Sequence, residues 1–165
     1  MYAFQYHRAT SVEQARERLR AQSGAKLLAG GQSLVASMKL RLADPAELID
    51  LSSIASLAGV QVGHRTVTVG AMTRHAEVAA SPEVKRALPS LAALAGGIAD
   101  RMVRNMGTLG GSVANNDPAA DYPAAVMALD ATVITDRRRI AADEFFVGMF
   151  QTALEADELI TAIEF

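Results

Sequence analysis

Short apolar runs alternate with amphipathic segments over the first part of the chain. Three short apolar runs predict strands, at Phe4–Tyr6, Lys26–Ala29 and Glu47–Leu51, and the second of them is expected to be buried. The first helix is expected to open at Thr10 or Ser11, because both begin a capping-box pattern, and to end at Gly24. Helical spacing from Leu34 to Leu42 predicts a second helix. The order strand, helix, strand, helix, strand favours a small parallel sheet.

The pattern changes to alternation with period two near residue 58. Gly59–Gly63 and Thr66–Gly70 alternate on either side of a turn at His64, which predicts an antiparallel hairpin. Ser81-Pro82 is a typical helix start, and apolar spacing predicts a helix over residues 88–102. The remaining expected elements are a helix at Pro123–Leu129 and strands at Thr132–Thr135 and Glu158–Phe165.

These patterns predict an α+β fold of two lobes. Residues 1–57 form a lobe with a small parallel sheet, and residues 58–165 form a larger lobe with an antiparallel sheet. A cleft between two lobes is the natural ligand site. The segment from Arg104 to Tyr122 has neither periodicity and is rich in Gly, Asn, Asp, Ser and Pro. We expect it to be a long loop, and such loops are usually functional or disordered.

Composition and charge exclude several kinds of site and partner. The 165 residues include no cysteine, which excludes disulfides, cysteine-ligated zinc and cysteine-held iron-sulfur clusters. With 16 basic and 18 acidic side chains, interspersed, the chain lacks an electrostatic footprint for nucleic acid. The uncharged stretch from Ala87 to Ala99 is too short to span a membrane, and the first residues contain no apolar signal region. We therefore expect a cytoplasmic protein.

Several common motifs are missing from the sequence. It contains no G-x-G-x-x-G, no glycine-rich loop that ends in Gly-Lys-Ser/Thr, and no nucleophile elbow. His7, His64 and His75 lack ligand spacing, so each is interpreted as a surface or hydrogen-bonded histidine, and no metal site is predicted. The basic run Arg137–Arg139 is interpreted as a solvated turn.

Two glycine-containing segments are the candidates for binding a ligand. In the first, an apolar strand passes through Gly30-Gly31 into a helix, which lets backbone N–H groups cradle a phosphate. The alternative interpretation is that the two glycines only allow the backbone to pack closely against a neighbouring element. In the second, Thr108 and Ser112 flank Gly110-Gly111, so a further backbone nest is expected with hydroxyls at both rims.

Amides and carboxylates follow the second glycine segment. Asn115, Asn116, Asp117 and Asp121 suit the hydroxyl groups of a ribose or ribityl chain better than a second phosphate. For Asp117 alone, a solvated turn before Pro118 is an equal alternative. The two aspartates also form a potential acid-base pair, but no catalytic partner accompanies them. No catalytic residue is therefore predicted.

The segments Leu27–Leu34, Gly70–Thr73 and Arg104–Asp121, in this order and spacing, resemble the FAD-binding medium subunit of the molybdenum hydroxylases. This family includes enzymes similar to aerobic carbon monoxide dehydrogenase and to xanthine dehydrogenase. The resemblance covers nearly the whole chain. It implies a two-lobed α+β flavin domain of the PCMH type, which is shared with vanillyl-alcohol oxidase. It also implies that the chain, which ends at Phe165, lacks the C-terminal domain that usually follows in this family.

The resemblance implies a set of cofactor contacts, with the FAD pyrophosphate between the two glycine segments. By position these contacts are Ala29, Gly30, Gly31, Gln32, Ser33 and Leu34 from one lobe, and Thr108, Leu109, Gly110, Gly111 and Ser112 from the other. Asp121 matches an acidic contact to the sugar-like part of the flavin, beside Asn116 and Asp117, and Ile98, Leu159 and Ile160 match apolar contacts nearer the flavin. Gln32 stands where some relatives carry a histidine that links covalently to flavin, so non-covalent FAD is expected.

The role that the resemblance implies is electron transfer. In the family, electrons pass from a molybdenum cofactor on a large subunit, through iron-sulfur clusters on a small subunit, to FAD and then to NAD, a quinone or another acceptor. We therefore expect these two subunits as partners, with the molybdenum and iron-sulfur groups held only by them. Alternatives are a stand-alone flavin-dependent oxidoreductase of the same superfamily, and a binding module that has lost the cofactor.

Overall fold

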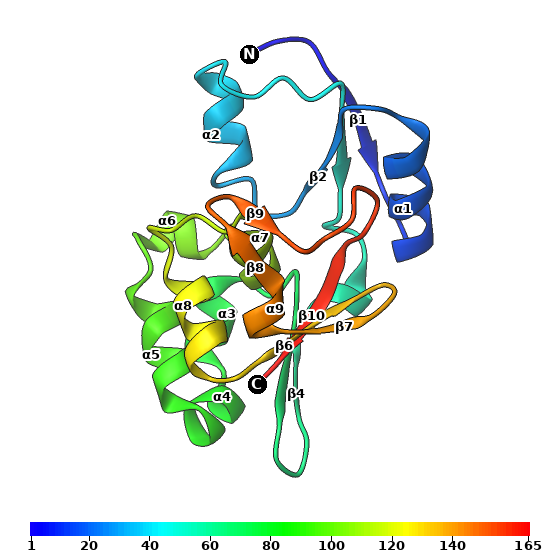
Figure 1. Ribbon diagram of the computed structural model, residues 1–165. Helices are drawn as coiled ribbons and strands as arrows, with labels where there is room; N and C mark the ends of the chain where they lie inside the picture. The colour runs from blue at the N-terminus through cyan, green and yellow to red at the C-terminus, as the bar shows by residue number, and fades with distance from the viewer.

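The computed structural model describes residues 1–165 and contains two lobes (Figure 1). The N-terminal lobe consists of β1 (Gln5–Arg8), α1 (Val12–Ala21), β2 (Ala25–Leu28), α2 (Leu34–Lys39) and β3 (Glu47–Asp50). Its three strands are parallel, in the order β1-β3-β2. Ser11 caps α1, because its side chain accepts a hydrogen bond from the backbone N–H of Gln14. The predicted strand–helix order and parallel sheet are confirmed in this lobe.

A 3-10 turn, η1 (Ala55–Leu57), leads into the second lobe. The helices of this lobe are α3 (His75–Ala80), α4 (Pro82–Ala87), α5 (Pro89–Gly97), α6 (Arg101–Arg104), α7 (Leu109–Asn115), α8 (Asp121–Ala128) and α9 (Ala142–Phe145). Its strands are β4 (Val60–Val62), β5 (Val67–Gly70), β6 (Thr132–Thr135), β7 (Arg139–Ala141), β8 (Phe146–Gly148), β9 (Gln151–Thr152) and β10 (Ile160–Glu164).

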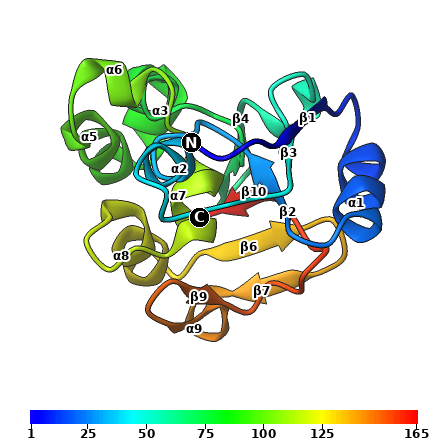
Figure 2. The same cartoon turned by 90° about the horizontal axis from the view of Figure 1, so that it is seen from above.

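The main sheet of the second lobe has the order β4-β5-β10-β6-β7, and all its pairs are antiparallel. The last strand of the chain, β10, lies at its centre, between β5 and β6. Seen from above, α3, α5 and α6 gather at one side of the molecule, whereas β6 and β7 lie beside α9 (Figure 2). The predicted hairpin is confirmed as β4 and β5, and Ser81 caps α4 as expected.

Two separate hydrophobic cores correspond to the two lobes. The smaller one lies under the parallel sheet, and the larger one joins the main sheet to α3, α5, α7 and α8. Leu159, which precedes β10, is buried in the smaller core. Arg16 and Arg20 of α1 also form ion pairs with Asp136 and Asp157 of the second lobe. Both apolar and ionic contacts therefore fix the lobes against each other. The division at residue 57 itself stays a prediction.

The segment from Arg104 to Tyr122 was expected to be a long loop, and that prediction was wrong, because a helix forms at its centre. The segment contains all of α7 and the first two residues of α8. The side chain of Thr108 starts α7 by accepting a hydrogen bond from Gly111 N–H at 3.2 Å. Leu109 and Val113 then bury one face of this helix in the larger core. Tertiary packing therefore produces a helix from residues of poor helical propensity.

Two further expectations need correction. The helix expected over residues 88–102 ends at Gly97 and restarts as α6, because Ala99 has a left-handed φ of 41° and Asp100 caps the next turn. The basic run is not simply solvated, since Arg137 pairs with Glu155 at 2.6 Å and Arg138 with Glu158 at 2.8 Å. No helix in the structure is long and apolar enough to cross a membrane.

Candidate functional site

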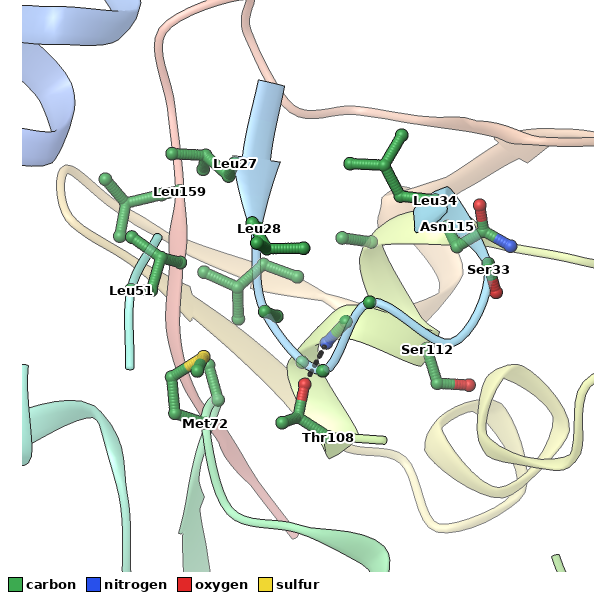
Figure 3. A pocket seen from close by; sticks show the side chains of 18 of the residues that line it. Leu27, Leu28, Ser33, Leu34, Leu51, Met72, Thr108, Ser112, Asn115 and Leu159 are labelled. Carbon is green, nitrogen blue, oxygen red and sulfur yellow. Dashed lines mark hydrogen bonds between the residues drawn. The ribbon is translucent and has the colours of Figure 1, made fainter. Parts of the chain in front are cut away.

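A cavity of about 580 Å³ lies where the two lobes meet. This volume falls within the range of small-molecule and cofactor sites. Leu27, Leu51 and Leu159 form an apolar wall on one side, whereas Ser33, Ser112 and Asn115 lie toward the other (Figure 3). The cavity opens beyond the carboxyl end of β2, the edge of a parallel sheet where ligands usually bind. The cleft expected between the lobes is therefore present.

The first glycine segment presents backbone donors that the protein does not use. None of the six N–H groups from Ala29 to Leu34 donates to a protein acceptor, whereas the neighbouring Val35 N–H bonds to Gly31 O at 3.0 Å. Gly31 has a left-handed φ of 71°, which turns the chain sharply between β2 and α2. Consecutive unused N–H groups in such a turn form a concave surface that suits an anion.

The two glycine segments touch each other across the lobe boundary. A Cβ atom at Gly30 would lie 2.2 Å from the carbonyl oxygen of Met106 and 2.7 Å from Cα of Gly107. A Cβ atom at Gly111 would lie 3.4 Å from Cβ of Ala29. At Gly30, only a residue without a side chain allows this approach. The contact brings the unused donors of one lobe next to the start of α7 in the other.

The second glycine segment does not offer the backbone nest that the sequence suggested. Gly110 N–H donates to Ala71 O at 2.8 Å, and Ser112 N–H donates to Thr108 O at 3.1 Å. Gly111 N–H donates to the Thr108 side chain (Figure 3). A Cβ atom at Gly110 would also lie 2.5 Å from Cβ of Ala71. The glycines here permit close packing of α7 on the end of β5, and the Ser112 hydroxyl is the polar group left at the rim.

Most residues predicted for the site line the cavity. They are Ala29, Gly30, Gly31, Gln32, Ser33, Leu34, Ile98, Thr108, Gly110, Gly111, Ser112, Asp117, Leu159 and Ile160. Thr108, Leu159 and Ile160 are nevertheless buried, so they expose little surface to a ligand and mainly pack behind the cavity wall. The Asp117 carboxylate accepts a hydrogen bond from Ala119 N–H at 2.9 Å. Asp117 therefore also forms the turn that was the alternative interpretation of this residue.

Three predicted residues lie outside the cavity lining. Leu109 is fully buried in the larger core. Asn116 ends α7 with a left-handed φ of 43°, and its amide donates to Gly148 O and Gln151 O, both at 2.8 Å. Asp121 is exposed at the start of α8. The structure therefore gives Leu109 and Asn116 packing and turn-closing roles, and their contact with a ligand stays a prediction.

Asn115, which the sequence suggested as a contact to a ribose or ribityl chain, also lines the cavity, and the structure adds two residues that the sequence did not indicate, Met72 and His75. His75 was interpreted as a surface or hydrogen-bonded histidine, and this was wrong. Its side chain is buried, and its Nδ1 atom has no hydrogen-bond partner. Burial lowers the pKa of His75 to about 4, although the negative charge of Asp121 acts in the opposite direction. The imidazole is therefore neutral near pH 7.

Charged groups are few around the cavity. Lys26 is the only Lys or Arg residue that lines it, opposed by Asp117, Glu155 and Glu158. The hydrogen bond from Arg138 lowers the pKa of Glu158 to about 2, so this carboxylate is already neutralised by a protein cation. An anionic group would therefore be held mainly by backbone N–H groups. No cluster of three or more His, Asp or Glu residues has the geometry to hold a metal ion.

Comparisons with known proteins agree with this site. A family model described as FAD binding domain in molybdopterin dehydrogenase matches residues 2–165. The carbon monoxide dehydrogenase medium chain of Hydrogenophaga pseudoflava is 44% identical over 97% of this chain and 58% of its own length. The nicotine 6-hydroxylase medium subunit of Paenarthrobacter nicotinovorans is 40% identical over 98% of this chain and 58% of its own length.

Solved structures give the same result. Carbon monoxide dehydrogenase from H. pseudoflava superposes with a TM-score of 0.97 at 43% identity, over 99% of this chain and 58% of that one. Quinoline 2-oxidoreductase from Pseudomonas putida 86 superposes with a TM-score of 0.96 at 33% identity, over 99% and 59%. The chain thus spans less than two thirds of the length of these relatives. The two-lobed α+β fold and the resemblance drawn from the glycine segments are confirmed. This chain belongs to the family of FAD-binding domains in molybdopterin dehydrogenases.

Proposed function

We propose that this chain binds FAD non-covalently in the cavity between its lobes, with the pyrophosphate on the first glycine segment. The observation that carries this proposal is the run of six unused N–H groups from Ala29 to Leu34 at the cavity rim. A pyrophosphate supplies the acceptors that these donors lack. The scarcity of lining cations agrees with binding by the backbone. The residues present therefore fit the cofactor that the family implies.

The side chains of the chain bind and shield the cofactor. The hydroxyls of Ser33 and Ser112, one from each glycine segment, line the cavity and supply further donors. Leu28, Ile98 and Met72 provide apolar area for ring systems. Gln32 donates to Gly30 O at 3.2 Å, which supports the loop, and a glutamine has no nucleophilic nitrogen for a covalent link to flavin. When bound, FAD would supply the electron-transfer chemistry, while the protein positions it.

The wider role that we propose is the flavoprotein part of a multi-subunit oxidoreductase of the molybdenum hydroxylase type. Electrons would arrive from iron-sulfur clusters on a small partner subunit, downstream of a molybdenum cofactor on a large one, and leave to NAD, a quinone or another acceptor. The names of the relatives support this, since they include medium chains of carbon monoxide dehydrogenase and glyceraldehyde dehydrogenase. The absence of cysteine agrees with iron-sulfur clusters that lie on another chain. A location in the cytoplasm is part of the proposal.

The proposal is tested by purification and reconstitution. The chain is purified, incubated with FAD and passed over a desalting column, and bound flavin is measured by its visible absorbance. We expect about one flavin per chain, and we expect acid precipitation to release it as intact FAD, because the binding is non-covalent. A chain that holds no flavin, both alone and when purified with its partner subunits, would contradict the proposal.

The same preparation separates the proposed role from that of a stand-alone flavoenzyme. Electron transfer to a dye acceptor is measured with the isolated chain and with the complex. Turnover of a small substrate by the isolated chain would favour the stand-alone enzyme. Turnover only with the iron-sulfur and molybdenum subunits would support the electron-transfer role.

A further inference from the structure

The structure shows three features of His75 that could not be predicted from the sequence. The side chain lines the cavity, only 5% of the residue is exposed, and no protein group hydrogen-bonds to the imidazole. A buried polar group without a partner is destabilising, and proteins retain few of them. The buried unpaired atom is Nδ1, which leaves Nε2 as the ring nitrogen that can meet a ligand in the cavity.

The imidazole lies next to the place where the two glycine segments meet. A Cβ atom at Gly107 would lie 2.5 Å from Nε2 of His75, so the ring reaches this place only because residue 107 has no side chain. Gly107 in turn contacts Gly30 of the first segment. The backbone of His75 is fixed here as well, since its N–H donates to Gly107 O at 3.0 Å. Nε2 is therefore held near the unused N–H groups of the first segment.

Tyr122 of α8 lies behind the imidazole. The two ring centroids are 5.3 Å apart, and the Tyr122 hydroxyl is also buried without a hydrogen-bond partner. Burial raises the pKa of this hydroxyl above its usual range, so it stays protonated and able to donate. A neutral imidazole has one donor and one acceptor nitrogen. A small ring movement that lets Nδ1 accept from Tyr122 would leave the proton on Nε2.

We propose that His75 is a direct ligand contact: its neutral imidazole donates from Nε2 to an oxygen of the bound cofactor beside the glycine segments, and Tyr122 is a positioning residue that selects this tautomer. The inference rests on the proposed FAD function and adds a side-chain donor to a site otherwise built from backbone groups. The acceptor is a phosphate oxygen or a ribityl hydroxyl, since both accept hydrogen bonds from a neutral donor.

The test combines imidazole NMR on the unchanged chain with binding by two variants. In the ¹⁵N-labelled protein, FAD should shift the His75 resonances and leave Nε2 protonated. A shift with inorganic pyrophosphate alone would identify a phosphate acceptor, and a shift with riboflavin alone would identify the ribityl chain. Because glutamine places an amide N–H near the position of Nε2, His75→Gln should keep FAD affinity within about threefold. His75→Asn, whose amide lies nearer Nδ1, should lose about tenfold or more.

The control is His64→Asn, because His64 is exposed in the β4–β5 turn and should be replaceable without effect. Tyr122→Phe should weaken FAD binding less than His75→Asn and should change the tautomer that NMR reports in the free chain. Circular dichroism shows whether each variant is folded. Unshifted His75 resonances in a chain that binds FAD would overturn this inference and leave the proposed function intact. If the unchanged chain binds no FAD, both proposals fail together.

Discussion

The two Gly-Gly pairs resemble each other in sequence but differ in what their backbones do. The first pair precedes α2 and the second lies in the first turn of α7, and a hydroxyl residue follows each pair, at Ser33 and at Ser112. In the first pair the N–H groups have no protein acceptor, and Gly31 adopts a left-handed φ. In the second pair both N–H groups bond to the protein. One pair therefore presents its backbone to the cavity, whereas the other brings a helix close to its neighbour.

A glycine pair in a sequence therefore indicates that another group lies close to the backbone, but it does not identify that group. At the first pair the other lobe approaches Gly30 through Met106, and the ligand that we propose would approach from the cavity. At the second pair the approaching group is the end of β5, since Gly110 contacts Ala71. The two reasons for glycine can be separated, because substitution at one pair should change binding and at the other should change folding.

The largest effect on folding is expected for Gly110→Ala. The new Cβ atom would meet the Cβ and backbone of Ala71 at 2.5–2.8 Å and would strain the hydrogen bond from Gly110 N–H to Ala71 O. Overpacking of this kind costs about 1–3 kcal/mol, and the weakened hydrogen bond adds about 1 kcal/mol. We expect the free energy of unfolding in urea to fall by about 3 kcal/mol. An unchanged urea midpoint would show that this pair is not a packing device.

A smaller loss of stability but a larger loss of binding is expected for Gly30→Ala. The new Cβ atom would lie 2.2 Å from Met106 O, but the strain is relieved when the half-buried loop moves away from the second lobe. We expect stability to fall by about 1–2 kcal/mol. The displaced donors should weaken FAD binding by about tenfold to a hundredfold, which corresponds to one or two hydrogen bonds to an anion. Flavin fluorescence titration measures this affinity.

Binding by Gly30→Ala that equals the unchanged chain would show that the position of the loop is irrelevant. Gly110→Ala serves as the matched comparison, because its folded fraction should bind FAD with an affinity nearer that of the unchanged chain. If Gly110→Ala loses more affinity than Gly30→Ala, the assignment of the two pairs is reversed.

The N-terminal lobe was predictable from local patterns, because each of its elements has its own signal. Ser11 caps α1, and apolar runs mark the strands, of which the central one, β3, is fully buried. The helix α7 was not predictable in this way, since its sequence from Leu109 to Asn115 holds two glycines and a C-terminal asparagine. Its stability comes from the burial of Leu109 and Val113 against strands that are distant in sequence. Local propensity cannot report such contacts.

The candidate site was predictable where its chemistry lies in the backbone. Glycine marks the positions of close approach at Gly30 and Gly31, and these positions line the cavity. His75 was missed because its signal is the absence of a hydrogen-bond partner, which exists only in three dimensions. Asn116 was selected for its amide, but that amide closes the turn to β8 and β9. An amide near a glycine segment therefore does not by itself indicate a ligand contact.

The smallest effect on folding is expected for Gly31→Ala, which tests the left-handed turn alone. Alanine in this conformation costs about 1–2 kcal/mol, and the nearest atoms are flexible methyl groups of Val35 and Leu28 at 3.0–3.3 Å, which can shift. We expect a urea-measured loss of about 1 kcal/mol and FAD affinity lowered severalfold, because a rotated peptide misdirects the N–H groups on either side of it. Gly97→Ala is the matched control, since its Cβ would meet no atom within 4 Å and alanine favours a helix. If both variants bind FAD like the unchanged chain, the donors of the first segment do not hold the cofactor, and the contrast between the two glycine pairs is one of packing alone.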